Sequence, residues 1–218
     1  MNLHILSEDR QEFFSELSFL KGRFYLAGGT GLALQIGHRD SIDFDFFSEK
    51  IFDEDKLLAE LLEKLPEHKI ISTQKDKGTL SVIIDGSIRA SFFYYKYRLI
   101  APLVKEYGFA DIASVEDIGV MKCSAITGRA SNKDYVDLYF ILRKITLKKL
   151  LSFTKAKLIS LDENLILKSM VYFEDVNEDK LLFMPGFEIS FSEVKKFLEK
   201  EVRNYTLKMI RGIRTGLE

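Results

Sequence analysis

One short segment near the N-terminus constrains the fold of this 218-residue chain more than any other part. A strand-like run, Phe24–Ala27, leads into a glycine turn, Gly28–Gly31, and a short apolar helix, Leu32–Ile36. A polar loop then precedes a second strand that carries Asp43 and Asp45. Because side chains alternate along a strand, both carboxylates project from one face, with their Cα atoms about 7 Å apart. The pattern predicts a pair of carboxylates on a strand beside a glycine turn.

Both parts of this segment suit phosphate and metal chemistry. A glycine turn that opens a helix presents backbone N–H groups to an anion. Two carboxylates on one strand face can hold one or two hard cations, and Mg2+ is usually bound by a few carboxylates together with substrate phosphates. Taken alone, the glycines are more often only a turn, and Asp-x-Asp is more often a solvated strand face. Their combination in this order indicates nucleotide chemistry.

The order of strand, glycine turn, helix, loop and Asp-x-Asp strand resembles the nucleotidyltransferase superfamily of the DNA polymerase β type. The motifs Ala27–Leu34 and Gly37–Phe47 look like those of the AbiEii/AbiGii family of abortive-infection toxins. A second pair of motifs, Met121–Arg129 and Lys133–Tyr139, is similar to the same family. The resemblance covers residues 24–142, and the remainder of the chain has the pattern of a helical tail.

Strands and helices alternate in the first half of the chain. The patterns predict helices after the caps Ser7 and Asp53, and strands over residues 68–73, 79–84 and 88–95, the last two joined by an Asp85-Gly86 hairpin turn. From Ser114 onward helical periodicity dominates, over residues 115–129, 134–143, 147–153, 161–172 and 191–210. We therefore expect an α+β (mixed α/β) fold: a nucleotidyltransferase-like mixed sheet with helices in a core lobe, residues 1–113, followed by a helical C-terminal lobe, residues 114–218.

Composition limits the partners and the compartment. The chain has 32 basic and 33 acidic residues, a net charge of −1, so a nucleic-acid partner would need a local basic patch. Cys123 is the single cysteine, which excludes an intrachain disulfide and fits a reducing cytosol. The sequence has no long apolar run, and its first residues are too charged for a signal peptide. We expect a cytoplasmic protein without membrane contact.

Two further groups of residues are candidates for the site. Lys122 and Arg129 are seven residues apart and share a helix face, so they either clamp triphosphate oxygens or form a solvated face. Lys133 and Asp137 either form an ordinary surface pair or belong to the site. The resemblance implies the functional reading of Lys122, with Lys133 on phosphate and Asp137 on the attacking hydroxyl, as its base or binding group. Asp134 fits a first-turn acid favoured by the helix dipole.

The chain departs from the superfamily at one position. Enzymes of the polymerase β type generally carry a third metal carboxylate on a later strand, where this chain has Ser91. Four explanations are open: two carboxylates suffice, Asp85 or Asp111 reaches the site, metal affinity is weak, or catalysis is lost.

The resemblance implies a Mg2+-dependent nucleotidyltransferase that moves a nucleoside monophosphate from an NTP to an acceptor hydroxyl. It further implies a toxin beside a cognate antitoxin protein, with tRNA or another RNA as acceptor. The alternatives are a small-molecule or protein acceptor, or an inactive nucleotide-binding or interaction module. The expected catalytic residues are Asp43, Asp45, Lys122 and Asp137, with Asp43 and Asp45 on the metal, and the expected nucleotide- and phosphate-binding residues are Gly28, Gly29, Thr30, Arg39, Lys122, Arg129 and Lys133. We expect Lys122 and Asp137 to face the two metal carboxylates across a cleft, on the order of 10 Å away.

Overall fold

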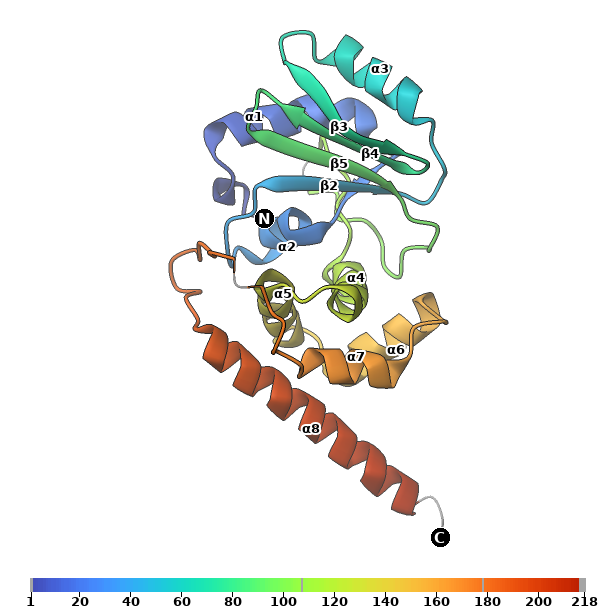
Figure 1. Ribbon diagram of the computed structural model, residues 1–218, viewed down its shortest axis with the longest axis vertical. Coiled ribbons are helices and arrows are strands. Elements are labelled where there is room, and N and C mark those ends of the chain that lie inside the picture. Colours follow the sequence, from blue (N-terminus) through green and yellow to red (C-terminus); the bar gives the residue numbers. More distant parts are fainter. Residues whose placement is uncertain (1, 107, 178, 216–218) are drawn as a thin grey trace. The chain divides into compact units, whose positions relative to one another are not determined.

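The computed structural model describes residues 2–106, 108–177 and 179–215, with side chains as far as residue 211 (Figure 1). The chain forms two compact units, Met1–Ile118 and Gly119–Glu218, and the division between them lies within helix α4 (Val115–Gly128).

The first unit is built on one five-stranded mixed sheet with the strand order β1-β2-β5-β4-β3. Its strands are β1 (Tyr25–Leu26), β2 (Asp43–Ser48), β3 (Ile70–Asp76), β4 (Thr79–Ile84) and β5 (Ile88–Tyr94). Its helices are the 3-10 turns η1 (Leu3–Ile5) and η2 (Leu17–Leu20), with α1 (Glu8–Glu16), α2 (Gly28–Ile36) and α3 (Glu54–Lys64). The pairing of β2 with β5 is parallel and the other strand pairs are antiparallel. This arrangement confirms the predicted mixed sheet with helices.

Alternation along β2 decides which residues enter the core. Phe44 and Phe46 are buried, while Asp43 and Asp45 lie on the opposite face and are partly exposed. The ring of Phe44 stacks on Phe14 of α1 with a centroid separation of 5.4 Å, and Phe46 stacks on Phe92 of β5 at 5.3 Å. Because burying an aromatic side chain is strongly favourable, this packing fixes the face from which the carboxylates project.

Local signals set several of the element ends. The Asp53 side chain accepts a hydrogen bond from Lys56 N at 3.0 Å and caps α3, as predicted. Ser7 occupies the N-cap position of α1, but its side chain accepts no backbone hydrogen bond there. Asp85 and Gly86 both have positive φ, 50° and 73°, the geometry of a tight hairpin turn between β4 and β5.

The second unit is helical, as the periodicity predicts. It contains the greater part of α4, then α5 (Asn132–Leu142), α6 (Leu147–Lys157), α7 (Glu163–Met170) and α8 (Phe191–Thr215). Ser190 and Glu193 form a reciprocal capping box that opens α8. Val194 and Leu198 of α8 are buried, and α8 packs against α5, α6 and α7.

Candidate active site

The glycines form the first turn of α2, which corrects the expected start of that helix. The sequence predicts a turn over Gly28–Gly31 and a helix from Leu32, whereas the helix begins at Gly28. The N–H of Gly31 donates to Ala27 O at 2.9 Å, so the regular helical hydrogen bonds start at Ala27. Glycine is tolerated here because the turn is held against β2, where Ala27 N donates to Asp45 O at 2.9 Å. The Ala27 side chain cannot cap the helix, so the first N–H groups of α2 are left to other acceptors.

The N-terminus of α2 approaches strand β2, which carries Asp43 and Asp45, so closely that position 28 cannot carry a side chain. A Cβ atom at Gly28 would lie 2.5 Å from Oδ2 of Asp45, and Gly28 has a φ of 62°. A Cβ atom at Gly29 would lie 2.7 Å from a terminal guanidinium nitrogen of Arg39 and 2.9 Å from Ser41 Oγ. The helix N-terminus, the Asp45 carboxylate and the Arg39 guanidinium are therefore neighbours.

Thr30 ties the same helix to the start of β2. Its hydroxyl donates to the backbone carbonyl of Asp43, and its Oγ1 lies 2.9 Å from Ser41 Oγ. Thr30 and Arg39 are both buried. Since the Thr30 hydroxyl is already bonded to the strand, we expect Thr30 to offer a phosphate its backbone N–H and not its side chain.

Asp43 has the properties of a metal ligand. Its Oδ1 is buried, and no hydrogen-bond donor among the described residues reaches it. A buried carboxylate oxygen without a donor is costly unless a cation or water satisfies it. Asp45 is two residues away on the same strand face. Oxygen donors of this kind fit Mg2+.

Two carboxylates form this candidate site in the described parts of the chain. No group of three or more His, Cys, Asp or Glu side chains suited to a metal occurs there. Asp85 accepts from the His68 ring at 2.6 Å and from Lys69 N, while Asp111 accepts from Gly22 N at 2.9 Å. Asp85 is thus engaged in other contacts, whereas Asp111 has one oxygen bonded to Gly22 N and a buried Oδ1 that no donor among the described residues reaches. A third side chain on the metal, if required, does not come from Asp85 or Asp111 in this conformation.

The second unit brings three of the expected charged residues, and one unexpected partner, into a compact cluster. Lys122 Nζ lies 2.7 Å from Asp134 Oδ1 and 2.6 Å from Asp137 Oδ2, and all three residues are buried. Arg129 Nε donates to Asp134 Oδ2 at 2.9 Å, while its side chain remains 69% exposed. The cluster contains two cations and two carboxylates. Its charges compensate each other, so it presents less positive charge to a triphosphate than Lys122 and Arg129 alone would.

Asp134 is the member of this cluster that the sequence interpretation missed. Burial raises the pKa of the Asp134 carboxyl, but the charge of Lys122 and the hydrogen bonds from Arg129 and Lys122 outweigh burial and hold that pKa below its usual value. The signal was present in the chain: Asp134 and Asp137 are three residues apart and share a face of α5. These two acids on one face of α5 match two cations, Lys122 on α4 and Arg129 directly after the end of α4.

Lys133 does not join this cluster. Its Nζ pairs with Asp179 Oδ2 at 3.0 Å, and both side chains are about two-fifths exposed. Asn132 strengthens the same junction by donating to Asp179 O at 2.7 Å. A phosphate-binding role for Lys133 would require this exposed pair to open, and exposed pairs contribute little stability.

Residues 13–112 match the family model described as Nucleotidyl transferase AbiEii toxin, Type IV TA system. An uncharacterized protein of Aquifex aeolicus is 40% identical over 187 residues, which cover 84% of this chain and 87% of that protein. The chain belongs to the AbiEii family. It is a nucleotidyltransferase toxin of the type IV toxin–antitoxin class.

Solved structures share the fold of this AbiEii-family chain. MenT4, a nucleotidyltransferase toxin from Mycobacterium tuberculosis, matches with a TM-score of 0.57 and 16% identity, over 86% of this chain and 82% of that one. A candidate nucleotidyltransferase from H. pylori matches with a TM-score of 0.57 and 20% identity, over 94% and 98% of the two chains. These similarities confirm the nucleotidyltransferase-like fold.

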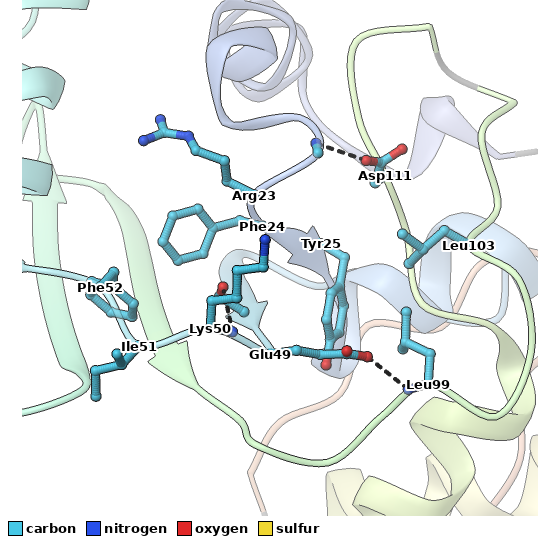
Figure 2. Close-up of a pocket in the computed structure, with 12 residues that line it drawn as sticks. Arg23, Phe24, Tyr25, Glu49, Lys50, Ile51, Phe52, Leu99, Leu103 and Asp111 are labelled. Atoms are coloured by element: carbon cyan, nitrogen blue, oxygen red, sulfur yellow. Dashed lines mark hydrogen bonds between the residues drawn. The ribbon is translucent and has the colours of Figure 1, made fainter.

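A cavity of about 430 Å³ lies at the other end of the β1–β2 pair (Figure 2). Its lining includes Phe24, Tyr25, Ser48–Phe52, Leu103 and Asp111. Asp111 accepts a hydrogen bond from Gly22 N at 2.9 Å, and Figure 2 marks the bond at Asp111 with a dashed line. Neither Asp43 nor Asp45 lines it, so this cavity is distinct from the carboxylate pair.

None of the helices in the described parts of the chain has the length and apolar character needed to cross a membrane.

We predict that Asp43→Asn abolishes nucleotidyl transfer without weakening the fold. The change removes one of two neighbouring negative charges and keeps the side-chain shape, so the melting temperature without divalent cations should stay level or rise. The stabilisation that the wild-type protein gains from Mg2+ with NTP should disappear. Asp76→Asn, on the exposed edge strand β3, is the control. Near wild-type transfer by Asp43→Asn would contradict the metal-site assignment.

We also predict that Asp134→Asn removes part of the acid sensitivity of the fold. The pKa of Asp134 is lower in the folded state than in the unfolded chain. Its contribution to the free energy of unfolding is therefore fully present above about pH 4 and is lost as the pH falls through the folded-state pKa. Urea unfolding at neutral pH should show a loss of about 2 kcal/mol for Asp134→Asn, with a shallower decline in acid.

The matched control is Asp179→Asn, which breaks an exposed Asp–Lys pair in the same unit. It should cost less than about 1 kcal/mol. An unchanged acid decline in Asp134→Asn would show that the cluster does not contribute in the way its geometry suggests.

Proposed function

We propose that this chain transfers a nucleoside monophosphate from an NTP to a hydroxyl of an RNA acceptor, with tRNA as the first candidate, in a reaction supported by Mg2+. The observation that carries the proposal is the contact of the α2 N-terminus with the Asp43–Asp45 strand. It places the first backbone N–H groups of α2, which have no side-chain cap at Ala27, beside two carboxylates. One of these, Asp43, has a buried oxygen that no donor among the described residues reaches. An NTP and its metal ion need both kinds of group.

In this proposal, different residues of the first unit bind the phosphates and the metal ion of the nucleotide. The N–H groups of Gly28, Gly29 and Thr30 would bind phosphate oxygens at the positive end of α2, and Arg39 would add a guanidinium beside them. Asp43 and Asp45 would hold Mg2+, which supplies charge neutralisation to the phosphates. Thr30 positions the strand through its hydroxyl, which donates to Asp43 O.

The transfer itself is an in-line displacement. The acceptor oxygen forms a bond to the α-phosphorus as the bond from that phosphorus to the α–β bridging oxygen breaks, and pyrophosphate leaves. The acceptor proton passes to a base, for which Asp137 is the candidate from the family motif. Because Asp137 is buried and paired with Lys122, this role requires the pair to rearrange when substrate binds.

Lys122, Arg129, Lys133 and Asp137 are proposed to support the phosphates and the acceptor. Arg129 has the most exposed side chain of the cluster formed by Lys122, Arg129, Asp134 and Asp137, with 69% of it accessible, so it can contact an anion while it stays paired with Asp134. In this proposal the core lobe is residues 1–113 and the helical lobe is residues 114–218. A cognate antitoxin protein is the proposed partner in the cell.

A second candidate is an inactive nucleotide-binding module, and Ser91 favours it. In the register of the sheet, Ser91 lies directly beside Asp45, at the position from which a third carboxylate could join the pair. If two carboxylates bind Mg2+ too weakly, nucleotide would bind without transfer.

The test is incubation of the protein with each α-labelled NTP, Mg2+ and total RNA, followed by sizing of the labelled product. We expect label from one or more NTPs in an RNA band, and no label with EDTA. NTP binding without any labelled product would establish the inactive module. Label in protein or in a small molecule would replace the RNA acceptor.

A further inference from the structure

The sheet face that carries Asp43 and Asp45 continues across β5 and β4. In the parallel register of β2 and β5, Arg89 lies beside Asp43 and Ser91 lies beside Asp45. The next strand brings Ser81 beside Ser91, and the two hydroxyl oxygens are 3.1 Å apart. Because side chains alternate, all of these groups project from the same face as the carboxylates.

Three rows of different chemistry therefore run across the strands. Phe47 and Phe93 form an aromatic row, with ring centroids 5.2 Å apart and both rings only partly buried. Ser91 and Ser81 extend the Asp45 row with small hydroxyl side chains. Arg89 extends the Asp43 row with a cation.

Arg89 is exposed and available for an incoming ligand. No hydrogen bond or ion pair joins its side chain to any residue in the described parts of the chain, although Asp43 is its direct neighbour across the strands. A single exposed arginine on a strand is often only solvated. Its position beside the candidate metal carboxylates, on β5 and so on the side of β2 opposite to β1, distinguishes it from an ordinary surface residue.

The in-line geometry of the proposed reaction gives this face a role. In the proposed function the glycine turn binds the phosphates on the β1 side of Asp45, so pyrophosphate would leave toward that side. The attacking hydroxyl must approach from the opposite side of the α-phosphorus, which is the β5 side. The acceptor then has to cover β5 and β4.

We infer that this face of β5 and β4 binds the single-stranded end of an acceptor RNA. Arg89 contacts a backbone phosphate by charge-assisted hydrogen bonds, and Phe93, backed by Phe47, stacks a base. Ser91 and Ser81 lie under the ribose, where a carboxylate in place of Ser91 would repel the RNA backbone. The inference rests on the proposed function, because that function sets the direction of approach.

The test compares three variants with the wild-type protein in binding a 5′-fluorescein-labelled, eight-nucleotide single-stranded RNA, followed by fluorescence anisotropy. Arg89→Ala should weaken binding about tenfold, and it should reduce the slope of log K against log salt by about 0.7, the value for one lost phosphate contact. Arg89→Lys should retain part of the affinity and the full slope. Phe93→Leu should weaken binding without changing the slope, since it removes stacking and no charge.

Three controls test whether a loss of RNA affinity comes from this face of the sheet. Lys56→Ala removes an exposed cation on α3, whose side chain is 85% accessible, and should leave RNA affinity unchanged. NTP affinity should stay within about twofold in the Arg89 variants, since the acceptor side is separate from the phosphate side. Circular dichroism confirms that each variant is folded.

Unchanged RNA affinity in both Arg89→Ala and Phe93→Leu would overturn the inference, as would an equal loss in Lys56→Ala. Weaker NTP binding with unchanged RNA binding would also overturn it and assign Arg89 to the nucleotide. If the wild-type protein transfers nothing to RNA while Arg89 and Phe93 still set RNA affinity, the proposed function fails and the RNA-binding face stands. If transfer to RNA occurs and neither Arg89 nor Phe93 affects RNA affinity, the proposed function stands and the RNA-binding role of this face is wrong.

Discussion

The contact between Gly28 and Asp45 is the constraint on which the candidate site depends. A Cβ atom at position 28 would meet the carboxylate at 2.5 Å, so only glycine allows the helix to begin where it does. Antiparallel pairing of Leu26 with Phe46 brings the two segments into register, and the Thr30 hydroxyl fixes the helix to the start of β2. The result is a helix N-terminus, with its partial positive charge, held against two acidic side chains.

The same strand connects the core to the chemistry. Phe44 and Phe46 are held by the aromatic rings of α1 and β5, and this burial forces Asp43 and Asp45 onto the other face. The parallel register of β2 with β5 then determines which side chains accompany the carboxylates. A shift of one residue in that register would replace Arg89 and Ser91 with the core residues of β5, so packing of the apolar face specifies the polar face as well.

Sequence reasoning succeeded where the physics is local and failed where it depends on distant partners. Alternation in β2, the Asp53 cap and the positive-φ Asp85-Gly86 turn each depend on a few neighbouring residues, and each was predicted correctly. The predicted start of α2, Leu32, is four residues too late. A run of glycines favours a turn over a helix in the sequence alone, and the contact with β2 that holds these glycines in a helical turn depends on residues distant in the chain. The pairing of Lys122 with Asp134, twelve residues away, depends on how two helices pack, and the helical pattern gives only the faces, not the pairs.

The most direct test of the central claim is the affinity for Mg2+–NTP of two glycine variants with similar backbone geometry. Gly28 and Gly86 both have positive φ, 62° and 73°, so alanine strains the backbone at either position. A Cβ atom at Gly86 would meet nothing within 4 Å, whereas one at Gly28 would collide with Asp45. With all four labelled NTPs tested by equilibrium binding, Gly86→Ala should bind like the wild-type protein and Gly28→Ala should bind at least about tenfold more weakly. Equal, unimpaired affinity in both variants would show that the contact between the α2 N-terminus and Asp45 does not form the nucleotide site.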